Sequence, residues 1–88
     1  MKAQEFPSMV RTADGRLRPV VRTVEEALGL IDCDLPPELR ALPRWTFARE
    51  LLVVAQRTGK KRDRMVAVRQ LKQALANEGW LAQASTQQ

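Results

Sequence analysis

The stretch FPSMVRTADGRLRPVVRT, residues 6–23, decides how this chain folds. Asp14 and Gly15 lie between two runs of strand-forming residues, and Asp-Gly is a preferred two-residue hairpin turn because both positions need positive φ. A turn centred there pairs Val10 with Pro19. The apolar face of this hairpin consists of Phe6, Val10, Leu17 and Val21. The sequence therefore predicts a β-hairpin with one buried side.

The opposite face of the predicted hairpin is strongly basic. It carries Met9, Arg11, Arg16, Arg18, Val20 and Arg22. In this register Arg11 lies directly across from Arg18, and like charges in that position destabilise a sheet unless solvent or a counter-charge neutralises them. Pro19 cannot donate a ladder hydrogen bond, so we expect the second strand to be an edge or to pair on one side only.

A helix is predicted immediately after the hairpin, over residues 24–31. Thr23 and Glu26 have the spacing of a capping box, in which the hydroxyl and the carboxylate satisfy amide groups at the start of the helix. The predicted buried stripe is Val24, Ala27, Leu28 and Ile31. Pro36 and Pro37 end this region, and a connector of about ten residues follows.

Two longer helices follow the connector. Residues 43–57 form the first, with Pro43 in its first turn and Gly59 as its stop signal. Residues 64–78 form the second, with Asp63 as its N-cap. Its predicted buried stripe is Met65, Val68, Leu71 and Leu75.

The predicted order β-β-α-α-α defines an α+β fold, a small two-layer domain with helices on one face of a hairpin. Residues 1–81 are predicted to form a single domain. Residues 82–88 are polar and unpatterned, which predicts a disordered C-terminal tail. A two-stranded hairpin alone is marginal in water, so it requires tight helix packing or strand pairing with a second copy.

Composition restricts the class of protein. The chain has 88 residues, a net charge of +5, one cysteine, and no histidine or tyrosine. At this length folding buries only about 60% of the unfolded chain's surface, which leaves no room for a second domain. No apolar run approaches the roughly 20 residues needed to cross a bilayer, and residues 1–10 lack the apolar core of a signal peptide. We therefore expect a cytoplasmic protein without a membrane partner.

Charge is arranged in blocks along the chain. Residues 24–39 carry five acidic and no basic side chains, whereas residues 40–64 carry eight basic and two acidic ones. The candidate contacts for an anion or nucleic acid are Arg11, Arg16, Arg18 and Arg22 on the hairpin, and Lys60, Lys61, Arg62 and Arg64 before the third helix. The candidate acidic docking surface for another protein is Glu25, Glu26, Asp32, Asp34 and Glu38. The plainer interpretation of the basic loop is a solvated connection that maintains solubility.

The residue inventory does not favour catalysis or metal binding. Cys33 lies between Asp32 and Asp34, whose negative charge disfavours a thiolate, so a buried structural role is predicted for it. Pro36-Pro37 breaks the loop geometry that an EF-hand needs, and the acidic block has no glycine at the sharp turn of such a loop. Without histidine or an activated cysteine, we expect a protein that is not an enzyme and that holds no cofactor or metal.

Four short motifs stand in a fixed order along the chain. They are TVEEAL at 23–28, LP at 35–36, LPRW at 42–45 followed by Ala48, and ALANEGW at 74–80. In order and spacing they resemble domain-of-unknown-function family 982, small proteins of rhizobial and related alphaproteobacteria, over nearly the whole chain. Lys60-Lys61-Arg62 departs from the small and acidic residues that are usual there in the family. The resemblance implies a compact α+β fold and a bacterial cytoplasmic protein, and it implies no activity, cofactor or site residue.

Two functions remain open at this point. The leading hypothesis is a non-enzymatic protein-interaction or regulatory module that binds another protein, or a second copy of itself as a homodimer. The alternative is weak nucleic-acid binding through the basic hairpin face or the basic loop before the third helix. One continuous positive face would favour nucleic acid, whereas two basic clusters that point apart would favour the interaction module.

Overall fold

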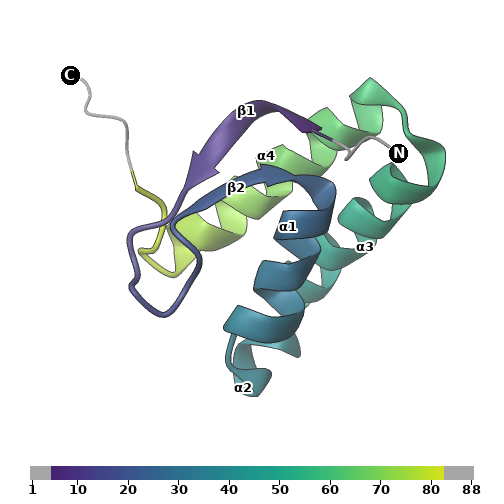
Figure 1. The fold of residues 1–88 in the computed structure, drawn as a ribbon. Helices are drawn as coiled ribbons and strands as arrows, with labels where there is room; N and C mark the ends of the chain where they lie inside the picture. The colour runs from purple at the N-terminus through teal and green to yellow at the C-terminus, as the bar shows by residue number, and fades with distance from the viewer. Residues whose placement is uncertain (1–4, 83–88) are drawn as a thin grey trace.

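The computed structural model describes residues 5–82, apart from the side chain of Ser8. A two-stranded antiparallel hairpin, β1 (Glu5–Arg11) and β2 (Val20–Thr23), lies against the helices (Figure 1). The helical elements are α1 (Val24–Gly29), the π-helical turn η1 (Leu30–Asp34), α2 (Pro37–Arg40), α3 (Pro43–Thr58) and α4 (Lys61–Asn77). The predicted α+β class is confirmed, with the short helix α2 added inside the predicted connector.

The hairpin turn lies one residue further along the chain than predicted. It runs from Asp14 to Leu17, where Leu17 N donates to the Asp14 carbonyl at 3.1 Å, so Gly15 and Arg16 form its centre. The Asp14 carboxylate accepts from Arg16 N at 2.8 Å. Aspartate favours the first position of a four-residue turn because its side chain can accept this bond. The prediction of a turn centred on Asp14-Gly15 is therefore wrong.

Moving the turn changes the strand register. Val10 pairs with Val21, and Arg11 pairs with Val20 rather than Arg18, before an irregularity toward the start of β1. The register near the turn is displaced by two residues, and an even displacement leaves each side chain on its original face. The four residues of the predicted apolar face are accordingly all buried.

The first helix begins where the capping box predicts. Thr23 Oγ1 accepts from Glu26 N at 3.1 Å, while the Glu26 carboxylate accepts from Arg22 N at 2.7 Å. The helix then continues as the π-helical turn η1. The helical region therefore ends at Asp34 and not at Ile31, where the sequence predicts its end. This continuation brings the Asp34 carboxylate within reach of the hairpin loop.

A tight turn joins α3 and α4. Gly59 has a φ of 67°, a left-handed conformation that glycine adopts without strain, and it ends α3 as predicted. Because α4 begins at Lys61, the prediction that Asp63 is its N-cap is wrong. The Asp63 carboxylate instead accepts from Thr58 Oγ1 at 2.6 Å, so it ties the end of α3 to the first turn of α4.

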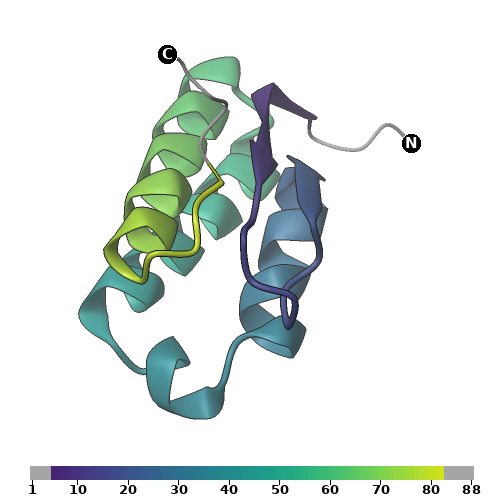
Figure 2. The ribbon, with the colours of Figure 1, turned by 90° about the vertical axis from the view of Figure 1, so that its left-hand side faces the viewer.

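The core lies between the hairpin and the helices. β1 contacts α4, β2 contacts α1, and α3 contacts both of these helices (Figure 2). Trp45 is the largest fully buried side chain. Small side chains at the helix contact allow α3 and α4 to approach closely. The fully buried alanines of these two helices are Ala48, Ala55, Ala67 and Ala74.

After α4 the chain returns to β1. Ala13 N donates to the Trp80 carbonyl at 2.7 Å, and Ala82 N donates to the Arg11 carbonyl at 3.0 Å. These bonds flank an isolated antiparallel bridge and cover the end of β1 that is nearest to the turn. Apart from Ala82, the tail predicted over residues 82–88 lies outside the described residues.

Candidate interaction surface

The basic face predicted for the hairpin is divided by the fold. Arg18 N donates to Asp34 Oδ2 at 3.0 Å, and its guanidinium binds both carboxylate oxygens, with Nε–Oδ2 at 2.7 Å and Nη2–Oδ1 at 3.2 Å. The guanidinium also approaches Gly29, where a Cβ atom would lie 2.7 Å from Nη1. Arg18 is therefore held against the first helical region, and the predicted position across from Arg11 is wrong.

Arg16 is also engaged, at the tip of the hairpin. Its guanidinium donates to the Asp14 carboxylate at 3.0 and 3.1 Å and lies 5.4 Å from the ring centre of Trp80. Such a position over an aromatic face adds a cation–π attraction. Of the four arginines predicted for this face, Arg11 and Arg22 are exposed on the strands, and Arg16 stays exposed at the tip while it contacts Asp14.

The predicted acidic docking surface is largely used in contacts within the fold. Asp34 binds Arg18, and the Asp32 carboxylate accepts two bonds from Arg49, at 2.9 and 3.2 Å. Glu26 accepts from the backbone of the hairpin, as described above, while Glu25 and Glu38 are exposed. Three of the five acidic residues therefore have partners within the fold, and an acidic docking surface formed by all five stays a prediction.

The two aspartates of η1 have pKa values that differ from those of free side chains. Hydrogen bonds from Arg18 lower the pKa of Asp34, and hydrogen bonds from Arg49 lower the pKa of Asp32, each against a smaller opposing effect of burial. A carboxyl with a lowered folded-state pKa stabilises the fold above its unfolded pKa of about 3.9, and that contribution disappears as the pH falls through the folded value.

We expect Asp34→Asn to destabilise the protein by about 1 kcal/mol at about pH 7, because the pair is partly exposed and screened by solvent. The difference from the unmodified chain should shrink as the pH falls below about 4. Urea unfolding at several pH values measures it. Glu50→Gln removes the same formal charge from an exposed site on α3 and is the control. Equal destabilisation at about pH 3 and about pH 7 would contradict this account of Asp34.

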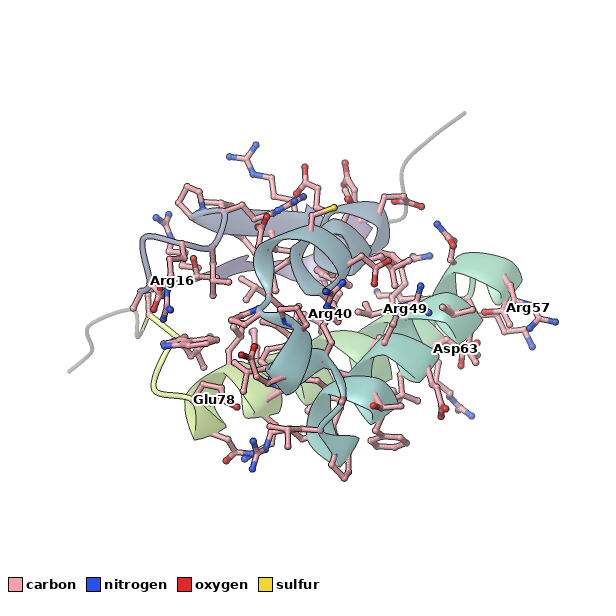
Figure 3. All side chains as sticks on the ribbon, turned by 90° about the horizontal axis from the view of Figure 1, so that it is seen from below. Arg16, Arg40, Arg49, Arg57, Asp63 and Glu78 are labelled. Carbon is pink, nitrogen blue, oxygen red and sulfur yellow. The ribbon has the colours of Figure 1, made fainter. Side chains whose placement is uncertain are left out.

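The cluster predicted as a basic loop lies mostly in the first turn of α4, because that helix begins at Lys61 and not at Arg64, and most of its charge is exposed. Lys60, Lys61 and Arg62 are exposed, and Arg64 Nη1 donates to the Gly59 carbonyl at 2.9 Å. Figure 3 places Arg57 and Asp63, which belong to this end of the α3–α4 pair, at the opposite end of the molecule from Arg16. The tip of the hairpin and the basic cluster therefore do not form one continuous positive face.

A different surface, which we name the Pro7 surface, surrounds the first half of β1. One hollow is lined by Glu5, Phe6, Pro7, Met9 and Arg22. A second, between β1 and α4, is lined by Pro7, Met65, Val68, Arg69 and Lys72. The two hollows share Pro7. They form an apolar centre with basic side chains on either side of the strand.

Sequence reasoning missed the Pro7 surface because a strand and a distant helix build it together. Met65 is predicted to be buried with Val68, yet 46% of its surface is exposed, whereas Val68 is buried. Met65 lies in the second turn of α4, where it lines the same hollow as Pro7 of β1 and is not covered by that strand. The one available signal is Pro7 itself, since proline within a strand favours a sheet edge.

Three further expectations from the sequence concern Cys33, metal binding and membrane crossing within residues 5–82. Cys33 is exposed, so the prediction that it is buried is wrong; the widened turn η1 directs it outward instead. Among these residues no group of three or more potential ligands is arranged to hold a metal ion. No described helix combines the length and apolar character that a bilayer crossing requires.

Comparisons with protein-family models, with curated proteins and with solved structures found no match for this chain. The resemblance to family 982 therefore remains a prediction that depends on the four motifs.

Proposed function

We propose that this chain is a non-enzymatic protein-interaction module of the cytoplasm, and that it binds another protein through the Pro7 surface. The observation that supports this proposal is the apolar centre of that surface, where Met9 is 44% and Met65 46% exposed beside Pro7. Arg22 and Arg69 flank this centre. Methionine and arginine are enriched in protein interfaces, where an apolar core is surrounded by a polar rim.

The residue inventory supports binding rather than catalysis. The chain contains no histidine, which is the commonest general acid or base near neutral pH. Asp34 and Asp32 are bound by arginines that lower their pKa values, so they are poor proton donors at neutral pH. The ion pairs with Arg18 and Arg49 give both aspartates a structural role in the fold, so a catalytic role is not needed to explain them.

Nucleic-acid binding is the second candidate, and the exposed cluster Lys60-Lys61-Arg62 at the start of α4 is the observation that favours it. Two of the hairpin arginines do not extend this cluster, because Arg18 is held by Asp34 and Arg16 lies at the opposite end of the molecule (Figure 3). We expect labelled duplex and single-stranded DNA to show no saturable binding at about 0.15 M salt. Tight binding that weakens steeply with salt and is lost when all three residues of the cluster become alanine would replace our proposal.

The interaction proposal is tested by capturing partners from the source cells with immobilised protein. The experiment compares the unmodified chain with Met65→Glu on the Pro7 surface and with Val54→Glu, a matched control at an exposed position on α3. We expect a protein that is retained by the unmodified chain and the control and is lost with Met65→Glu. The purified partner must then rebind in calorimetry. The proposal fails if no such protein rebinds, or if Met65→Glu, folded by circular dichroism, binds equally well.

A further inference from the structure

We infer that the Pro7 surface binds an extended segment of its partner, with alternating apolar and acidic side chains, as an added antiparallel strand along β1. This inference depends on the proposed function and goes further, because it specifies the conformation and the charge of the partner segment. Three features of the described residues support it. They are the hydrogen-bonding edge of β1, the hollow beside that edge, and the charges at its rim.

The first feature is that β1 already pairs on this edge with another segment. The Arg11 carbonyl and the Ala13 amide bind the segment Trp80–Ala82, whereas the intervening Thr12 amide donates to the Pro19 carbonyl at 3.0 Å on the opposite side. Backbone groups alternate between the two sides of a regular antiparallel strand, which places the amide and carbonyl of Met9, at the border of the register irregularity between Glu5 and Val10, on the same edge as those of Arg11.

Pairing on this edge is incomplete within residues 5–82. The sheet of the described chain contains only β1 and β2, and the bridge to Leu81 lies beyond the end of β1. The edge between Glu5 and Val10 therefore has no strand partner in that part of the chain. An extended peptide can add to an open edge through its main chain, but Pro7 has no amide proton, so on this edge the Met9 amide supplies the donor beside the bound C-terminal segment.

The second feature is the hollow between β1 and α4. Its volume is about 260 Å³, below the roughly 300–1,000 Å³ of typical small-molecule pockets. Pro7, Met65 and Val68 provide an apolar lining. Every second side chain of an added strand points to the same face, so a row of apolar side chains fits along this hollow.

The third feature is the charge at the rim. Arg22 lies on the β2 side of the strand, whereas Arg69 and Lys72 lie on the α4 side. Glu5 is the one acidic residue among those that line the two hollows. A partner segment with acidic side chains is therefore attracted to both sides of the hollow, and a basic segment is repelled. The apolar lining and the basic rim together specify alternating apolar and acidic residues.

The test uses a synthetic peptide of alternating valine and glutamate, about eight residues long, with blocked ends. Its binding to the full chain is measured by NMR and fluorescence. We expect saturable binding that slows exchange of the Met9 amide proton. A valine–lysine peptide should bind at least about tenfold more weakly, as should the valine–glutamate peptide with N-methyl groups on alternate amides.

Variants of the protein locate the site. Arg69→Glu and, independently, Arg22→Glu should weaken binding of the valine–glutamate peptide by about tenfold or more. Arg57→Glu makes the same charge change at an exposed position at the end of α3 and should leave the affinity within about twofold. If Arg57→Glu weakens binding as much as Arg69→Glu, the peptide responds to net charge alone and the inference is wrong.

Other outcomes would also overturn the inference. They are the absence of saturable binding up to about 1 mM peptide, and binding that N-methylation leaves unchanged. Sedimentation that shows a dimer disrupted by Arg69→Glu would identify a second copy as the occupant. Peptide binding only after removal of residues 83–88 would identify the chain's own end. A partner that is captured through Met65 despite failure of these peptide tests would leave the proposed function standing.

Discussion

Trp45→Ala is expected to remove about 3–5 kcal/mol from the free energy of unfolding, as truncation of a large buried aromatic usually does. Trp45 is fully buried, and its Nε1 donates to Glu78 Oε2 at 3.2 Å, so the side chain links the first turn of α3 to the end of α4. A chain of 88 residues is expected to have a total stability of roughly 4–13 kcal/mol. The substitution therefore removes a large share of it, and urea denaturation measures the loss.

Trp45→Phe separates the packing of this residue from its hydrogen bond. It keeps most of the apolar volume and removes the bond to Glu78, which still accepts from Arg44 at 2.9 Å. We expect a loss of about 1–2 kcal/mol, clearly below that of the alanine variant. Equal losses for the two variants would show that the hydrogen bond, and not the buried ring, accounts for the effect.

Val21→Asp is expected to cost about 3–5 kcal/mol, because it removes buried apolar surface and places a carboxylate in the core without a partner. Val21 is fully buried in β2, opposite Val10. The substitution tests the central structural feature, namely that the hairpin packs one face against the helices. Thermal and urea unfolding should both show the loss.

Val20→Asp is the matched control for Val21→Asp. Val20 is the preceding residue of the same strand, only partly buried, and its side chain lies on the opposite face of the hairpin. It makes the same chemical change, and we expect it to cost about 1 kcal/mol, within the range of strand propensity. If both variants are destabilised equally, the faces of the hairpin are not assigned as described here.

The hairpin shows which structural features can be predicted from a local sequence pattern and which cannot. The alternation of apolar residues predicts the buried face of the hairpin correctly, because a two-residue displacement of the register leaves the same side chains on that face. The turn itself is misplaced because the Asp14 carboxylate binds Arg16 N, which favours Asp14 as the first residue of the turn rather than its centre. A side-chain hydrogen bond thus favours a turn one residue beyond the one that the sequence pattern predicts.

The charged residues show where local pattern fails. The blocks of charge predict a basic hairpin face and an acidic patch, but Arg18 and Asp34 bind each other across 16 positions of the sequence. Arg49 and Asp32 do the same across 17 positions. Each pair takes one charge from a basic region and one from the acidic block, so both predicted surfaces lose members. Folding rearranges charge in this way because close opposite charges attract far more strongly than separated ones.

The amino-acid sequence by itself determined the class of fold, the order of the two strands and of the three longer helical regions, most of the core, and the absence of histidine and tyrosine. Periodicity and capping depend on residues within a few positions of one another, so they can be read along a chain. Only the tertiary structure decided which arginines stay exposed and that Pro7 lies beside Met65 and Arg69. Such juxtapositions depend on how β1 packs against α4, and no local pattern records the distance between residues that are far apart in sequence.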